Sequence, residues 1–180
     1  MGLEEDAEGI IRKLSLANRF DKYGEAHLVG NVVLKTTIKP DIDIQIYSKE
    51  SDWVQNAQLI IGDFKEDGLN NYIYRDLKQS GKYLVSFSYL YRGTIWTIDI
   101  TQTEPNDNYL KDAYRFLLDY QGKLTNETTN TILKLKQYFL EKGKLQNSMS
   151  YYIYRSVLDD EAKTPENVLA YIESYKDQND

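Results

Sequence analysis

Two aspartates stand one residue apart in the stretch Asp41-Ile42-Asp43-Ile44-Gln45-Ile46-Tyr47. Apolar and polar residues alternate strictly along it, which is typical of a β-strand with one buried face. The isoleucines are expected in the core, so Asp41 and Asp43 are expected on the opposite face, roughly 6–7 Å apart. Two carboxylates at that spacing repel each other unless a cation lies between them. The pattern therefore indicates a site for a hard divalent cation, Mg²⁺ or Mn²⁺.

A third aspartate stands in a second alternating stretch, residues 94–101. There Trp96, Ile98 and Ile100 share one face, and Asp99 lies on the other face between two threonines. If the two strands are neighbours in one sheet, three carboxylates converge. A pair of metal ions held by such carboxylates can clamp both the attacking and the leaving oxygen of an in-line displacement at phosphorus. An isolated Asp-x-Asp pair on a strand, by contrast, is more often only the solvent-facing side of a half-buried sheet.

A glycine precedes the aspartate pair at a defined distance. Gly30-Asn31 is followed after nine residues by Asp41-Ile42-Asp43-Ile44. This arrangement resembles the signature of the nucleotidyltransferase superfamily with the DNA polymerase β-like fold. That signature is a hydrophobic residue, Gly, then Gly or Ser, a spacer, Asp-hydrophobic-Asp/Glu-hydrophobic, and a third acid on a later strand. His27, Gly30 and the pair Lys39-Pro40 are also similar to the GrpB-type branch of that superfamily.

The resemblance implies a role for each residue of the motif. Asp41 and Asp43 would bind the metal ions that hold a nucleoside triphosphate, and Asp99 would bind the catalytic metal and act as the base. Gly30 and Asn31 would cradle phosphate, because glycine has no Cβ to keep the backbone away from it. Lys39 would meet the negative charge of the triphosphate. The activity implied is metal-dependent transfer of a nucleoside monophosphate from an NTP to a hydroxyl of a small-molecule acceptor.

One departure from the signature leaves a second hypothesis open. Asn31 stands where the signature has Ser or Gly. The alternative is a catalytically weakened module of the same fold that senses nucleotides or binds proteins. A third hypothesis, transfer to a protein or to RNA, would be favoured by a basic patch formed by Arg75, Lys78, Lys82 and Arg92.

Composition and charge bear on partners and compartment. The 180 residues carry a net charge of -6, and the pI is about 4.9. Nucleic acids usually bind basic surfaces, so this balance disfavours a large nucleic-acid partner. The absence of cysteine excludes disulfides and thiolate metal sites. No apolar run is long enough to cross a bilayer, and the first nine residues are acidic, unlike a signal peptide. We therefore expect a cytoplasmic protein with no membrane partner.

The order of the expected elements predicts an α+β fold, with a nucleotidyltransferase-like mixed β-sheet backed by helices and followed by a C-terminal helical part. Helices are expected at residues 3–21, 51–67, 108–120, 128–142 and 150–158, with another beginning at 164–165, and strands at 26–29, 41–47, 72–77, 83–91 and 94–101. We expect the α+β core to occupy residues 1–104 and the helical part residues 105–180. The stretch 101–107 is the expected hinge.

Overall fold

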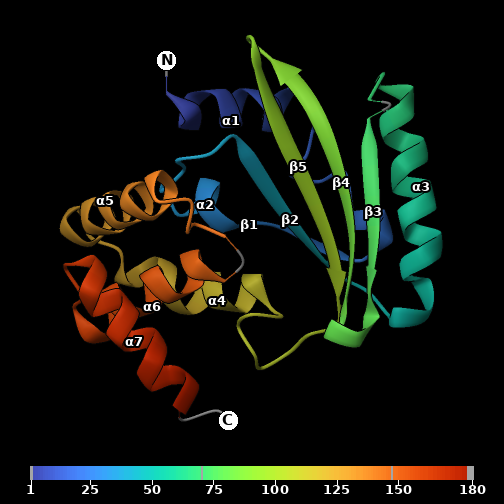
Figure 1. Cartoon of the computed structure of the whole chain (residues 1–180). Coiled ribbons are helices and arrows are strands. Elements are labelled where there is room, and N and C mark those ends of the chain that lie inside the picture. The colour runs from blue at the N-terminus through green and yellow to red at the C-terminus, as the bar shows by residue number, and fades with distance from the viewer. Residues whose placement is uncertain (1, 70, 147, 178–180) are drawn as a thin grey trace. The chain divides into compact units, whose positions relative to one another are not determined.

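The computed structural model describes residues 2–69, 71–146 and 148–177. Its main elements are α1 (Leu3–Lys13), β1 (Glu25–Val29), α2 (Gly30–Val33), β2 (Asp41–Tyr47), α3 (Trp53–Glu66), β3 (Tyr72–Leu77), β4 (Lys82–Tyr91), β5 (Thr94–Thr103), α4 (Ala113–Tyr120), α5 (Asn126–Glu141), α6 (Met149–Asp160) and α7 (Pro165–Asp177) (Figure 1). The α+β class expected from the sequence is confirmed. Of the helices in the described part of the chain, none is long and apolar enough to span a membrane.

The chain divides into two compact units, Met1–Leu118 and Asp119–Asp180. Residues 105–118 therefore belong to the unit that contains the sheet. They are attached to it by Asp112, which accepts hydrogen bonds from Gln45 and Tyr47 of β2. The expectation of an α+β core at 1–104 and a helical part at 105–180 stays a prediction.

The first unit is built on a five-stranded mixed sheet with the order β1-β2-β5-β4-β3. β2 and β5 run parallel, and every other neighbouring pair is antiparallel. Figure 1 shows the long β4–β5 hairpin extending beyond the other strands. Strict alternation sends Ile42, Ile44 and Ile46 of β2 and Ile98 and Ile100 of β5 to one face and the aspartates to the other. We call the face that carries the aspartates the carboxylate face.

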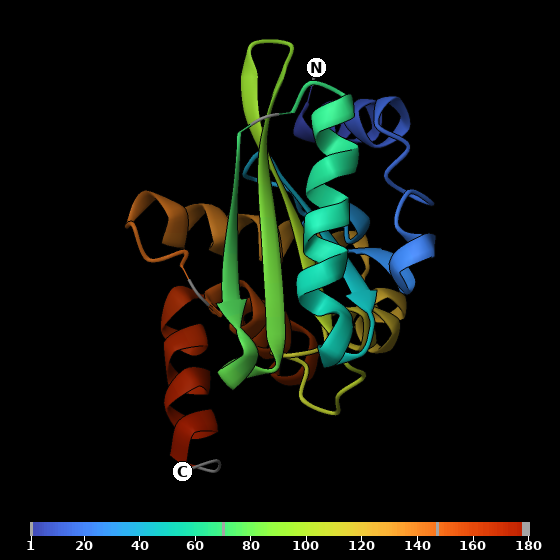
Figure 2. The ribbon, with the colours of Figure 1, turned by 90° about the vertical axis from the view of Figure 1, so that its right-hand side faces the viewer.

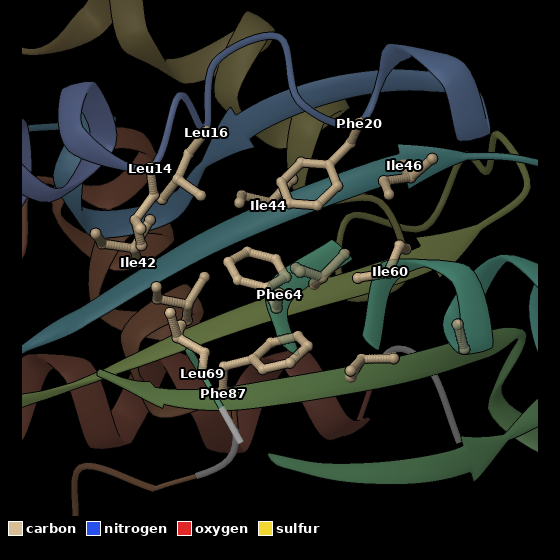
Figure 3. Close-up of a cluster of buried hydrophobic side chains, with 14 of the residues drawn as sticks. Leu14, Leu16, Phe20, Ile42, Ile44, Ile46, Ile60, Phe64, Leu69 and Phe87 are labelled. Carbon is tan, nitrogen blue, oxygen red and sulfur yellow. The ribbon is translucent and has the colours of Figure 1, made fainter. Parts of the chain in front are cut away.

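The opposite face of the sheet forms the hydrophobic core. α1 and α3 contribute Ile10, Trp53, Ile60 and Phe64 to it, all essentially without solvent exposure. Figure 2 shows α3 running along this face of the strands, and Figure 3 shows how the side chains of β2, β4 and α3 interdigitate. Burying one such side chain stabilises the fold by roughly 1.5–3 kcal/mol. This packing fixes which face of β2 and β5 is left for the aspartates.

The structure corrects the bounds of the first helix. α1 ends at Lys13 rather than near residue 21. Ser15 adopts a left-handed backbone (φ 53°), and the amide of Leu16 bonds the carbonyl of Ile11 at 2.9 Å, which terminates the helix. Leu16 and Phe20 still reach the core, but from irregular chain.

The connector between the glycine and the acidic strand is also more ordered than expected. It begins with the short helix α2, and Gly30 is the first residue of that helix. The expected helix at 108–120 begins later, at Ala113. A separate turn at residues 108–112 precedes it, with the amide of Asp112 bonded to the carbonyl of Asn108 at 3.0 Å.

The second unit contains α5, α6 and α7. Thr125 caps α5 in a reciprocal pair with Thr128: each side chain bonds the backbone amide of the other residue. At the start of α7 the amide of Asn167 donates to the hydroxyl of Thr164 at 3.3 Å, as the Thr-Pro sequence indicated. Arg155 of α6 pairs with Asp159 and donates to the Tyr151 hydroxyl, so this tyrosine-rich segment is held together internally.

Candidate functional site

The pairing of β2 with β5 places two of the three aspartates side by side. Asp43 lies directly opposite Asp99, and Asp41 lies opposite Thr97. Residues that face each other across a ladder point to the same side, so all three carboxylates belong to the carboxylate face. Neighbouring strands are about 4.8 Å apart, which brings the side chains of Asp43 and Asp99 within reach of one small ligand.

Gly30 lies against the Asp43 carboxylate. Its backbone is left-handed (φ 72°), a conformation that costs free energy for residues other than glycine. A Cβ atom at this position would stand 2.5 Å from Oδ2 of Asp43. Gly30 therefore leaves room for the Asp43 carboxylate. The backbone approach to phosphate expected at Gly30 stays a prediction.

Ser86 of β4 completes a row of polar residues with Asp43 and Asp99. It lies opposite Asp99 in the β4–β5 ladder, is almost fully buried, and donates a hydrogen bond to Oδ1 of Asp99. Burial raises the pKa of the Asp99 carboxyl above its ordinary value, while the hydrogen bond from Ser86 and the positive charge of Arg75 act in the opposite direction. Ser86 was not predicted from the sequence, because only the register of β4 against β5 shows that it is a neighbour of Asp99.

The two remaining residues of the motif flank the aspartates. Asn31 follows Gly30 in α2, and its carbonyl accepts the amide of Thr36 at 3.0 Å. Lys39 stands two residues before Asp41, and its carbonyl bonds the amide of Asp41 at 2.9 Å. Both residues are half-buried next to β2. Their roles in binding a triphosphate stay predictions.

The chemistry of the three carboxylates fits Mg²⁺ or Mn²⁺, because hard cations prefer oxygen ligands. Within residues 2–69, 71–146 and 148–177, no three His, Cys, Asp or Glu side chains lie close enough together to form a metal site by themselves. One oxygen of Asp99 is engaged by Ser86. The metal-binding roles of Asp41, Asp43 and Asp99 are therefore carried forward as a proposal.

Farther along β2, Asp112 forms a buried network that sequence reasoning did not foresee. The Tyr47 hydroxyl donates to both of its carboxylate oxygens at 2.6 and 2.7 Å, and the Gln45 amide donates at 2.9 Å. The backbone amide of Arg115 also bonds Asp112, at the first turn of α4. Burial alone would raise the pKa of Asp112, but these hydrogen bonds outweigh it and lower the pKa below its ordinary value. The local signal was an aspartate immediately before a helical stripe.

Aromatic side chains line the carboxylate face beside this network. The rings of His27 and Tyr114 stack with centroids 3.4 Å apart and an interplanar angle of 3°. A pocket of about 670 Å³ lies next to them, and its walls include Tyr47, Pro105, Asn106, Asp112 and Tyr114. Tyr47 is four residues from Asp43, or roughly 13 Å along the strand. The pocket therefore lies at the Tyr47 end of β2.

Comparison with solved structures gives extensive matches. The non-canonical poly(A) polymerase complex GLD-2–GLD-3 matches with a TM-score of 0.62 and 15% identity, over 86% of this chain and 51% of that one. The Cid1 poly(U) polymerase with MgGTP bound matches with a TM-score of 0.58 and 17% identity, over 87% of this chain and 49% of that one. The CdnC:HORMA-deltaN complex of E. coli MS115-1 matches with a TM-score of 0.56 and 14% identity, over 96% of this chain and 64% of that one.

The chain has the nucleotidyltransferase fold. This confirms the fold resemblance that the sequence carried in Gly30 and the aspartate motif; the narrower resemblance to the GrpB-type branch stays a prediction. The chain spans about half the length of the two polymerases that it matches. No protein-family model matches the sequence, and no curated protein does. At 14–17% identity the nucleotidyltransferase fold is shared, and activity has to be argued from the site.

Proposed function

We propose that this chain is a metal-dependent nucleotidyltransferase. It transfers a nucleoside monophosphate from an NTP to a hydroxyl of a small-molecule acceptor. The observation that carries the proposal is the pairing of Asp43 with Asp99 on the carboxylate face, with Gly30 packed against Asp43. The Cid1 structures with MgGTP and with Mg 3'-dATP support a Mg²⁺ nucleotide as the donor.

Each residue has a distinct task in this proposal. Mg²⁺ or Mn²⁺, when bound, supplies positive charge that neutralises the phosphates. Asp41 and Asp43 position the triphosphate, and Asn31 and Lys39 contact its oxygens. Asp99 accepts the proton of the acceptor hydroxyl, and its burial raises its pKa and so strengthens it as a base. The bond from the α-phosphorus to the pyrophosphate oxygen breaks as the bond to the acceptor oxygen forms, and pyrophosphate leaves.

A small acceptor agrees with the distribution of basic side chains. Because two of the matching structures are named as poly(A) and poly(U) polymerases, RNA is the competing candidate for the acceptor. Arg92, however, is paired with Asp6 at the hairpin tip, and the Lys82 ammonium donates to the carbonyl of Leu110. Two of the four basic residues that would favour RNA are therefore committed to contacts within the protein. The acidic net charge of -6 acts in the same direction.

The test is release of pyrophosphate from each of the four NTPs with Mg²⁺ or Mn²⁺. One set of reactions receives a pool of metabolites below about 1 kDa, and a second set receives an oligoadenylate. Release that requires the metabolite pool and falls by at least about a hundredfold in Asp99→Asn supports the proposal. Release stimulated only by the oligonucleotide would contradict the small-molecule acceptor, and equal release by the Asp99→Asn variant would contradict the assigned site.

The presence of Asn31 favours one alternative function, that of a module that binds a nucleotide without catalysing its transfer. Its side-chain amide stands where the signature of active enzymes has Ser or Gly. Binding of a metal-bound NTP without pyrophosphate release under any acceptor would support this second function. Restoring the signature with Asn31→Ser would then be expected to produce measurable release if Asn31 is what weakens the site.

A further inference from the structure

The geometry of in-line transfer divides the carboxylate face into a donor side and an acceptor side. In the proposed function, on which this inference rests, the triphosphate lies near Gly30 and Asp43, over β1 and β2. The attacking hydroxyl must approach the phosphorus from the side opposite the leaving pyrophosphate. Since β5 follows β2 in the sheet, the acceptor then lies beyond Asp99, over β4 and β3.

β3 presents an unusual surface on that side. The row that contains Asp43, Asp99 and Ser86 continues to Ile73 on β3. Arg75 and Leu77 follow Ile73 at alternate positions and so share the carboxylate face. Ile73 and Leu77 are 51% and 38% exposed, and Arg75 is exposed between them.

Arg75 differs in its contacts from the arginines that carboxylates hold. Across residues 2–69, 71–146 and 148–177, no hydrogen bond or ion pair involves its side chain, whereas Arg19, Arg92 and Arg155 are all bound to carboxylates. Its positive charge nevertheless acts on the Asp99 carboxyl. A guanidinium with free donors binds phosphate or carboxylate groups through bidentate hydrogen bonds.

We infer that Arg75 binds an anionic group of the acceptor, while Ile73 and Leu77 contact the apolar or aromatic body of the same molecule. The acceptor is thus an anionic small molecule with a free hydroxyl. Arg75 is a specificity residue that touches the acceptor away from the reacting oxygen. Its loss weakens acceptor binding and leaves donor binding intact.

The test uses isothermal titration with the donor site filled by Mg²⁺ and α,β-methylene-ATP, an analogue whose α-phosphorus cannot lose pyrophosphate. The probes are AMP, inorganic phosphate and adenosine. Adenosine is AMP without its charged phosphate group. Arg75→Gln removes the guanidinium from an exposed edge strand. Arg12→Gln is the matched control, because Arg12 is an exposed guanidinium on α1 whose partner among the described residues is Glu8, at 3.8 Å. Thermal unfolding of both variants checks that the fold is kept.

We expect AMP and phosphate to bind the wild type, to bind Arg75→Gln at least about tenfold more weakly, and to bind Arg12→Gln unchanged. Adenosine should bind more weakly than AMP and equally in all three proteins. Unchanged AMP affinity in Arg75→Gln, or failure of both anions to bind while α,β-methylene-ATP binds, overturns the inference and leaves the donor site standing. Failure of α,β-methylene-ATP itself to bind refutes the proposed function, and the inference with it.

Discussion

A Cβ atom on Gly30 would stand 2.5 Å from Oδ2 of Asp43, so the glycine of the motif and its second aspartate are in direct packing contact. Gly30 also has a positive φ of 72°. The two features have separate consequences. The backbone conformation affects stability, and the missing Cβ determines where the Asp43 carboxylate can lie. The site thus requires a glycine at position 30, because a side chain there would collide with the Asp43 carboxylate.

Gly30→Ala is expected to weaken binding of a metal-bound NTP by at least about tenfold, because the new methyl group must displace the Asp43 carboxylate. Its left-handed backbone also costs about 1–2 kcal/mol of stability. Gly81→Ala is the matched control: Gly81 has a φ of 70° and open space around it. Urea unfolding should show that Gly81→Ala destabilises the fold by a similar amount. Calorimetry should show that Gly81→Ala leaves the NTP affinity unchanged. Equal NTP affinity in both variants would show that the contact with Asp43 is not important for binding.

Asp112→Asn is expected to lower the free energy of unfolding by about 1–3 kcal/mol at pH 7, because the buried carboxylate accepts several hydrogen bonds. The folded pKa of Asp112 is lowered from 3.8. Its ionised form therefore stabilises the fold above pH 3.8, and that contribution is lost as the pH falls through the folded pKa. The difference between wild type and variant should shrink in urea unfolding below pH 3.8.

Asp107→Asn is the control for this pH dependence. Asp107 is 93% exposed in its ion pair with Arg115, so solvent screens the interaction. We expect little change in stability at either pH. An Asp112→Asn difference that is the same at pH 7 and in acid would contradict the assignment of Asp112 as an ionised, hydrogen-bonded group.

Thr125→Ala is expected to destabilise the second unit by about 1 kcal/mol, because it removes the cap of α5. Thr131→Ala, in the same helix, removes a hydroxyl that donates to the carbonyl of Glu127 within its own helix and should be neutral or slightly stabilising. Thermal unfolding followed by circular dichroism separates the two. An equal effect of both substitutions would show that the cap contributes nothing.

The parts of the fold that follow local periodicity were predictable from the sequence. Alternation in β2 and β5 predicted which residues face the core, and Ile42, Ile98 and Ile100 are fully buried. The Thr164-Pro165 pair marked the start of α7. Thr125 was missed as the α5 cap, because its partner is Thr128 and not the glutamate or glutamine of the usual capping box.

Features that depend on long-range pairing were not predictable. The Asp43–Asp99 and Ser86–Asp99 neighbours follow from strand order and register, which no local pattern encodes. The bonds from Tyr47 and Gln45 to Asp112 join residues more than sixty positions apart. The sequence predicts too long an α1, because the apolar positions at Leu14 and Phe20 continue into irregular chain that also packs in the core.

The central claim is that the carboxylate face binds a metal-bound nucleoside triphosphate. The most direct measurement is calorimetric titration of the four NTPs, with Mg²⁺ or Mn²⁺, into the wild type and into a variant that carries Asp41→Asn and Asp43→Asn. We predict metal-dependent binding to the wild type that is lost in the variant, with both proteins equally folded by circular dichroism. Binding of equal strength to the variant, or binding to the wild type that does not need the metal, would contradict the assignment of these aspartates.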